Sequence, residues 1–211
     1  MASPHSDASS PSPSLALWLA PEEPLASELR WWIDQLSQRL SGPRFEPHVT
    51  VLSSLPGDLS EALTLTEQLA QRLSPVPIET EGVALLRHYY RAVVLPIFMT
   101  PPLWRAHLAA RWTFENGAAP EGRPTYEEED ASEDKVSFFP HLSLYYGKAP
   151  LSTRIEAIDS FGEVPDFTFL ASAIQLISVG PDPENWEIVT SFPLKGLPER
   201  PFGTSIDPKT S

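Results

Sequence analysis

Hydrophobic and polar residues follow two different periods along the first half of the chain. Residues 15–19 form a short apolar run that favours a buried strand, and residues 25–40 place leucine, tryptophan and isoleucine at helical spacing. A Ser-Gly-Pro sequence ends this predicted helix. Residues 45–52 then alternate as in a strand, and the period predicts a second helix over residues 60–73.

The second half continues with strands and helices in turn. Two runs, 78–86 and 90–97, are predicted to pair as a hairpin around residues 87–89. Further elements are predicted as helices over 101–114 and 152–160, and as strands over 141–146, over 167–179 with a break near Ala171-Ser172, and over 187–192. Because several neighbouring strands are hairpins, the pattern indicates an α+β fold with a mainly antiparallel sheet.

Three segments fall outside this pattern. Residues 1–14 are rich in serine and proline and are predicted to be a disordered tail, and residues 196–211 a C-terminal tail. Residues 116–135 carry seven acidic and two basic side chains, a net charge of 2 − 7 = −5, and are predicted to be a surface insertion. It is either a lid or inert, and charged runs favour the inert alternative. The folded domain is predicted to span residues 15–195.

Net charge and cysteine content exclude several classes of function. At −13, the chain would repel a phosphate backbone, so we expect no long nucleic-acid partner, whereas a small phosphorylated ligand remains compatible. Without cysteine there is no disulfide, no thiolate zinc site and no cysteine nucleophile. The apolar run of residues 15–20 is too short for a signal peptide or a membrane span. We therefore expect a soluble, intracellular monomer, most simply a cytoplasmic one.

An internal repeat is the strongest chemical signal. Phe45–Val51 reads F-E-P-H-V-T-V, and Phe138–Leu144 reads F-F-P-H-L-S-L. Both copies follow the pattern F-x-P-H-apolar-Thr/Ser-apolar, and their histidines lie 93 residues apart. Of the five histidines, only His48 and His141 have a serine or threonine two positions later. A serine or threonine two residues after a single histidine is a common coincidence. Because both histidines also share the preceding Phe-x-Pro, a coincidence at both is disfavoured.

This repeat suits the cleavage of a phosphodiester. Side chains two apart on a strand share a face, so His48 lies beside Thr50, and His141 beside Ser143. If the two copies pack about a pseudo-twofold axis, one neutral imidazole can take a proton from water while the other, as imidazolium, protonates the leaving oxygen. The hydroxyls can donate to the phosphoryl oxygens. Which histidine is the base stays open.

Other ligands for these residues are less compatible with the pattern. Two histidines and two hydroxyls make a poor zinc or iron site, and Pro47 interrupts the strand at Glu46, so we expect neither metal nor cofactor. Near the hairpin end, Tyr89, Tyr90 and Arg91 are candidates to touch an adenine or a phosphate. The alternative for Arg91 is a plain surface arginine.

The paired H-x-[TS]-apolar motifs resemble those of the 2H phosphoesterase superfamily. From about Leu15 to about Leu194, the chain is most similar to the cyclic phosphodiesterase family of fungi and plants, including the opening L-A-L-W-L, P-H-L-S-L-Y-Y and the closing W-E-I-V. The resemblance implies two lobes with antiparallel sheets lining a central cleft and helices outside. It implies metal-independent hydrolysis of ADP-ribose 1″,2″-cyclic phosphate, a by-product of tRNA splicing, and of nucleoside 2′,3′-cyclic phosphates to 2′-phosphates.

The resemblance also implies a tyrosine that contacts the substrate. In the family it lies five residues after the second histidine, which is Tyr146 here, whereas strict strand alternation puts Tyr145 on the face of His141. A bulge or strand end after Ser143 would favour Tyr146.

Two other functions stay open. The first is a 2H enzyme that processes RNA ends, such as a 2′–5′ RNA ligase-like protein, and the acidic charge disfavours the basic groove it needs. The second is a protein that binds cyclic phosphates without cleaving them, which has no use for two proton-transfer groups.

Overall fold

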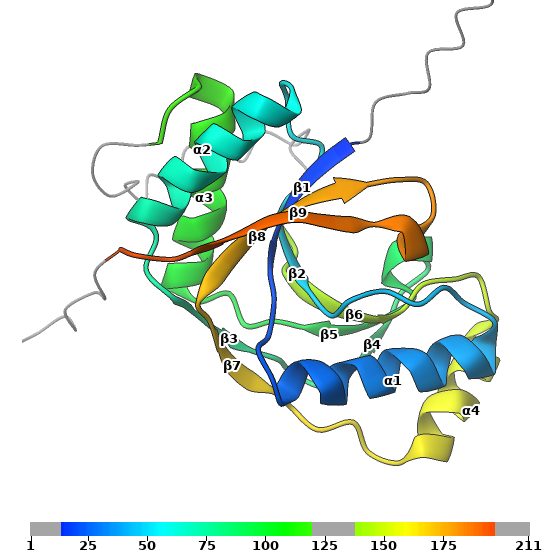
Figure 1. Ribbon diagram of the computed structural model, residues 1–211. Coiled ribbons are helices and arrows are strands. Elements are labelled where there is room, and N and C mark those ends of the chain that lie inside the picture. The colour runs from blue at the N-terminus through cyan, green and yellow to red at the C-terminus, as the bar shows by residue number, and fades with distance from the viewer. Residues whose placement is uncertain (1–13, 120–137, 197–211) are drawn as a thin grey trace, which may run out of the picture.

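The computed structural model describes residues 14–119 and 138–196 (Figure 1). The strands are β1 (Ser14–Leu19), β2 (Val49–Leu52), β3 (Val76–Glu79), β4 (Ala84–Leu85), β5 (Val93–Pro96), β6 (His141–Tyr145), β7 (Thr168–Ala171), β8 (Ala173–Val179) and β9 (Glu187–Pro193). The helices are α1 (Leu25–Leu40), α2 (Leu59–Arg72), α3 (Pro101–Asn116) and α4 (Leu151–Phe161), with 3-10 turns η1 (Tyr89–Arg91) and η2 (Pro183–Asn185).

The strand order of the main sheet is palindromic except for β9, which has no counterpart. Seven strands run β4-β5-β6-β2-β1-β8-β9, and all their pairings are antiparallel. If β5 is matched to β1 and β6 to β2, then β4 beside β5 corresponds to β8 beside β1. The remaining strands, β3 and β7, pair with each other in a separate two-stranded sheet. The chain is therefore two similar halves related by a pseudo-twofold axis between β2 and β6, which confirms the predicted α+β class.

The helices obey the same symmetry. Helix α1 packs against β6 and α4, and α3 packs against β2 and α2, so each half covers the motif strand of the other (Figure 1). The inner face of α1 carries Leu29, Ile33 and Leu36, all fully buried, as its helical period predicts. Asp58 caps α2 by accepting from the Glu61 amide at 2.9 Å. None of the helices in the described part of the chain is long and apolar enough to span a membrane.

Most predicted elements are confirmed, with three corrections. The predicted strand 90–97 begins only at Val93, because residues 89–91 form the 3-10 turn η1. The predicted strand 78–86 is instead two strands in different sheets, β3 and β4, because Gly82, with φ of +61°, turns the chain between them. The predicted strand 45–52 begins only at Val49, since Pro47 cannot donate to a ladder. The hairpin, the two long N-terminal helices and the break after Ala171 are confirmed.

The predicted flanking segments lie almost wholly outside the described residues. Ser14 opens β1 instead of closing a tail, and Asn116 is the last residue of α3. Residues 1–13, 120–135 and 197–211, to which the tails and the acidic insertion were assigned, are not described.

Candidate active site

The two motifs meet at the centre of the main sheet. Strands β2 and β6 are neighbours through a single register pair, Val49 with Leu142, the residues that directly follow His48 and His141. His48 immediately precedes β2, and His141 is the first residue of β6. The pairing therefore brings together the two histidines, which are 93 residues apart in sequence.

Both imidazoles are oriented by the same backbone contact. Nδ1 of His48 lies 2.7 Å from the Glu46 carbonyl oxygen, and Nδ1 of His141 lies 2.8 Å from the Phe139 carbonyl oxygen. Because a carbonyl only accepts hydrogen bonds, Nδ1 carries the proton in both rings. Nε2 is then the basic nitrogen of each neutral ring, and both sides offer the same atom for proton transfer.

His48 is packed among aromatic rings. Its imidazole stacks on Trp18 with ring centroids 3.5 Å apart and planes within 5°, while Phe45 and Trp186 lie 6.3 and 6.0 Å away. Only 5% of the residue is exposed. Burial, and then the nearby charge of His141, lower the pKa of His48 to about 3, so its ring is neutral at pH 7.

His141 is more accessible than His48. Its ring lies 5.3 Å from that of Phe139, and the residue is partly exposed. Burial lowers the pKa of His141, and the charges of Arg91 and His88 lower it further. With no anion bound, both rings are therefore predominantly neutral at pH 7.

A register comparison explains why the two histidines differ. Trp18 on β1 pairs with Thr50, and the equivalent partner of Ser143 on β5 is Val94. A valine has no ring to stack on an imidazole. Within the described residues, the aromatic ring nearest His141 in the sequence and in space is that of Phe139, at 5.3 Å, and no indole covers His141 as Trp18 covers His48.

The two predicted hydroxyls are placed differently. Ser143 is 3% exposed, and its Oγ donates to the Tyr90 carbonyl oxygen at 3.1 Å. Thr50 is partly exposed at the middle of the motif. In this state, Ser143 must rotate before it donates to a phosphoryl oxygen, so the hydroxyls are not interchangeable.

Each motif strand contains a β-bulge at the same position. In β2 the register passes from Thr50 to Leu52 and skips Val51, and in β6 it passes from Ser143 to Tyr145 and skips Leu144. One extra residue reverses the alternation beyond it. Tyr146 therefore falls on the face of Ser143, which is the outcome that a bulge after Ser143 would produce.

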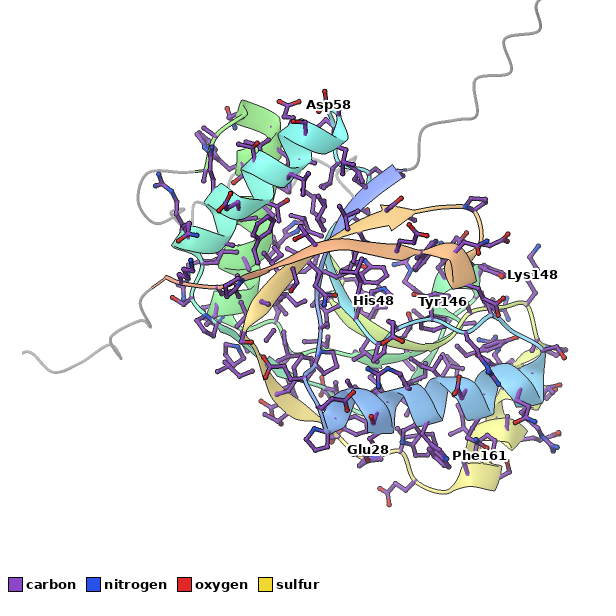
Figure 2. The ribbon with its side chains drawn as sticks, in the orientation of Figure 1. Glu28, His48, Asp58, Tyr146, Lys148 and Phe161 are labelled. Carbon is purple, nitrogen blue, oxygen red and sulfur yellow. The ribbon has the colours of Figure 1, made fainter. Side chains whose placement is uncertain are left out.

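The two tyrosines accordingly point to different surroundings. The Tyr146 hydroxyl lies 3.5 Å from Nε2 of His48 (Figure 2). The Tyr146 ring stacks on that of Phe45, with ring centroids 3.8 Å apart. Burial raises the pKa of Tyr146, so the hydroxyl keeps its proton and can donate it in a hydrogen bond. Tyr145 instead points away and donates to the Leu40 carbonyl oxygen at 3.1 Å.

The motif pattern did not predict the role of His107. On α3, its Nδ1 lies 2.8 Å from the carbonyl oxygen of Val51, the bulged residue of β2. Its ring stacks on Phe138, the first residue of the second motif, at 4.0 Å and 1°. The only signal in the sequence is a histidine four residues after buried Leu103, on the apolar stripe of the helix.

The described residues offer no obvious metal site. Within residues 14–119 and 138–196, no three His, Cys, Asp or Glu side chains are grouped so that they could hold a metal ion.

Two solved structures of similar fold are bacterial. TT0787 of Thermus thermophilus is 18% identical with a TM-score of 0.54, and the match covers 87% of this chain and 98% of that one. LigT of E. coli, solved with ATP, is 11% identical with a TM-score of 0.53 over the same shares of the two chains. These likenesses confirm the fold. A search among curated proteins found no match.

The family comparison covers most of the chain. Residues 14–190 match the model of the family described as cyclic phosphodiesterase-like protein, a span that includes both motifs and every element up to β9. This match agrees with the expected 2H phosphoesterase superfamily and indicates a phosphodiesterase-type enzyme. The chain belongs to the cyclic phosphodiesterase-like family.

Proposed function

We propose that the protein hydrolyses ribose cyclic phosphates, namely nucleoside 2′,3′-cyclic phosphates to 2′-phosphates and ADP-ribose 1″,2″-cyclic phosphate, without a metal. The observation that carries the proposal is the pair of Nδ1-anchored imidazoles on adjacent strands, each with Nε2 as its proton-transfer atom. We also propose that it belongs to the fungal and plant branch of the family and acts on by-products of tRNA splicing.

The reaction needs one proton removed and one delivered. Nε2 of one neutral histidine accepts a proton from water as the water oxygen bonds to phosphorus. The other histidine, as imidazolium, donates its Nε2 proton to the ribose oxygen as the P–O ester bond breaks. In a nucleoside 2′,3′-cyclic phosphate the 3′ oxygen leaves, and the phosphate stays on the 2′ oxygen.

Binding of an anionic substrate favours the imidazolium form of one histidine, which the reaction needs and which is scarce in the free protein. Both histidines have a lowered pKa in the free protein. A phosphate anion placed between them favours the charged form of the nearer ring, which raises its pKa. The Tyr146 hydroxyl, which is 3.5 Å from Nε2 of His48, is within reach of a phosphoryl oxygen bound at that nitrogen.

The rings beside His48 favour a nucleoside on the phosphate. Tyr90 is 40% exposed and Trp186 partly exposed, and their ring centroids lie 6.1 Å apart. Exposed aromatic faces stack on bases. LigT, which shares the fold, was solved with ATP, with 3′-AMP and with phosphate, which supports a phosphorylated nucleotide as the ligand class.

Turnover in EDTA tests the proposal. Wild-type protein is expected to convert adenosine 2′,3′-cyclic phosphate to the 2′-phosphate, identified by chromatography. His48→Ala and His141→Ala are each expected to lose at least about 100-fold in kcat, the usual contribution of a positioned acid or base.

Two results would overturn it. Equal turnover by folded alanine variants would show that the histidines are not the acid–base pair. No turnover of any ribose cyclic phosphate, together with retained binding, would favour the binding protein, and cleavage confined to RNA ends would favour the RNA-processing enzyme.

A further inference from the structure

The loop between β4 and β5 concentrates positive charge in an otherwise acidic protein. Arg87–Arg91 reads R-H-Y-Y-R, and the whole chain has a net charge of −13. Arg87 and His88 are exposed, and Arg91 is partly exposed. Across residues 14–119 and 138–196, neither arginine forms an ion pair with a carboxylate. Their charges are thus available to an anion.

A buried arginine holds the neck of this loop. Arg154 on α4 is 6% exposed, and its Nη1 donates to the Leu86 carbonyl oxygen at 2.8 Å and also to the Ala92 carbonyl oxygen. The Leu86 amide closes the same neck by donating to Ala92 at 3.3 Å. Burying a guanidinium is costly unless hydrogen bonds compensate for it. Because Arg154 donates to two carbonyl oxygens of the loop neck, it holds the loop in place and adds no charge to the protein surface.

The loop is also attached to the candidate active site. Ser143 donates to the Tyr90 carbonyl oxygen at 3.1 Å, and the Gly147 amide donates to the Tyr89 carbonyl oxygen at 2.9 Å. The Tyr90 ring lies 5.5 Å from that of Tyr146. These contacts hold the loop against the second motif strand and the residues that follow it, and the charges of Arg91 and His88 lower the pKa of His141.

We propose that Arg87–Arg91 is a second anion subsite, which binds a phosphoryl group of the substrate other than the one hydrolysed. This inference rests on the proposed function. The planar guanidinium matches the geometry of phosphate oxygens, and a loop held in place loses little entropy on binding. Among the substrates of the proposed function, the loop then distinguishes those that carry a further phosphate or diphosphate, such as ADP-ribose 1″,2″-cyclic phosphate, from unsubstituted nucleoside cyclic phosphates.

Two substrates that differ in one phosphate test this subsite. Adenosine 2′,3′-cyclic phosphate is compared with the same compound carrying a 5′-phosphate. We expect wild-type kcat/KM to favour the second by about 10-fold or more, mainly through KM, the range of a charge-assisted contact. Arg91→Gln and Arg87→Gln are expected to reduce this ratio toward one. Arg39→Gln, an exposed arginine on α1, is the matched control and should keep it.

The outcomes separate this inference from the proposed function. Equal kcat/KM for the two substrates in wild type would overturn the subsite while leaving the hydrolysis intact. So would an equal loss on both substrates in Arg91→Gln, because the arginine would then act on the reacting phosphate.

A binding experiment covers the case in which nothing is cleaved. By calorimetry, adenosine 5′-monophosphate should bind wild type more tightly than adenosine does, and Arg91→Gln should lose the difference. Equal binding of both by wild type would overturn the subsite independently of any turnover.

Discussion

Tyr145 and Tyr146 are adjacent in sequence but contact different parts of the molecule. Tyr145 is 1% exposed and fills the space between two glycines, since a Cβ on Gly42 or Gly147 would collide with its ring or hydroxyl. Tyr146 reaches His48 instead. Periodicity alone favours Tyr145 for the site, and it fails here because the bulge at Leu144 is set by pairing with β5, which the sequence of β6 does not encode.

Removing one hydroxyl at a time separates the two tyrosines. Tyr146→Phe keeps the stack on Phe45 and should lower kcat/KM about 10-fold, because a donor beside His48 is lost. Tyr145→Phe loses its bond to Leu40 and should cost about 1 kcal/mol of stability with little change in kcat. Steady-state kinetics and urea unfolding measure both effects, and the reverse pattern would contradict this assignment.

Burial of His48 should make folding sensitive to acid. Its pKa is about 3 in the folded protein and near 6.5 when unfolded, so between these values only the unfolded state takes up the proton. Stability from this group is complete above about pH 6.5 and falls by at most about 1.4 kcal/mol per pH unit below it.

Urea unfolding of wild type and His48→Asn at several pH values tests this linkage. Wild type should lose up to about 2.5 kcal/mol more than the variant between about pH 6.5 and about pH 4.5. The difference between the two proteins cancels the contributions of His107 and His141, whose pKa values are lowered as well. Parallel pH curves would contradict a buried, neutral His48.

The bulges are the features that the two motif strands share at the level of elements. A bulged residue leaves the ladder, so its carbonyl needs another donor. His107 supplies one to Val51 and stacks on Phe138, so a single side chain of α3 contacts both motifs. We therefore expect His107 to be a positioning residue for the first motif.

Two variants of His107 separate its hydrogen bond from its stacking. His107→Phe keeps a ring on Phe138 but loses the donor, and kcat should fall about 10-fold with little change in KM, since small displacements of reacting groups are costly. His107→Asn restores a donor near the position of Nδ1 and should recover part of that loss. The Hε1 resonance of His48 should shift in the phenylalanine variant.

Thr113→Val is the matched control for these variants. It removes a buried hydrogen bond within the same helix, from Thr113 Oγ1 to the Ala109 carbonyl oxygen at 2.6 Å, rather than a hydrogen bond from the helix to a motif. It should lower stability and leave kcat and the His48 resonance unchanged. If it lowers kcat as much as His107→Phe does, the role of His107 is only structural.

Local sequence patterns predicted the positions of helices and strands better than they predicted which elements contact each other. Helix α1 was predicted at its observed bounds because its leucines and tryptophans repeat with the helical period, and the repeat predicted the histidine pair. The pattern missed that β3 separates from β4 and pairs with β7, and that Arg154 holds the loop after β4. Both features depend on contacts between residues far apart in sequence, such as Arg154 and Leu86. Local periodicity carries no information about such contacts.

At the scale of the whole molecule, charge limits the ligand. A net charge of −13 opposes any partner that is read mainly through its phosphate backbone, while the loop Arg87–Arg91 offers positive charge only locally. Small anions fit this distribution better than polymers do.

Binding of a single-stranded RNA of about 20 nucleotides without a terminal cyclic phosphate tests this limit. At about 150 mM salt, fluorescence anisotropy should give a Kd weaker than about 100 µM, at or beyond the weak end of ordinary non-specific binding. Micromolar binding that weakens steeply with salt would contradict it and favour the RNA-end enzyme.

Because the strand order is palindromic about β2 and β6, the backbone fold places the two histidines in equivalent positions. In each half, Nδ1 of the histidine lies beside the carbonyl oxygen of the residue two positions earlier, and a bulge occurs three residues after the histidine. A phosphate on the axis could therefore be approached by water from either side. Side chains that are not repeated make the sides unequal, among them Trp18 and Tyr146 at His48 and Arg91, whose charge acts on His141. In the proposed reaction, the departures from symmetry thus decide which histidine is the acid and which the base, and exchanging them across the axis should exchange these two roles.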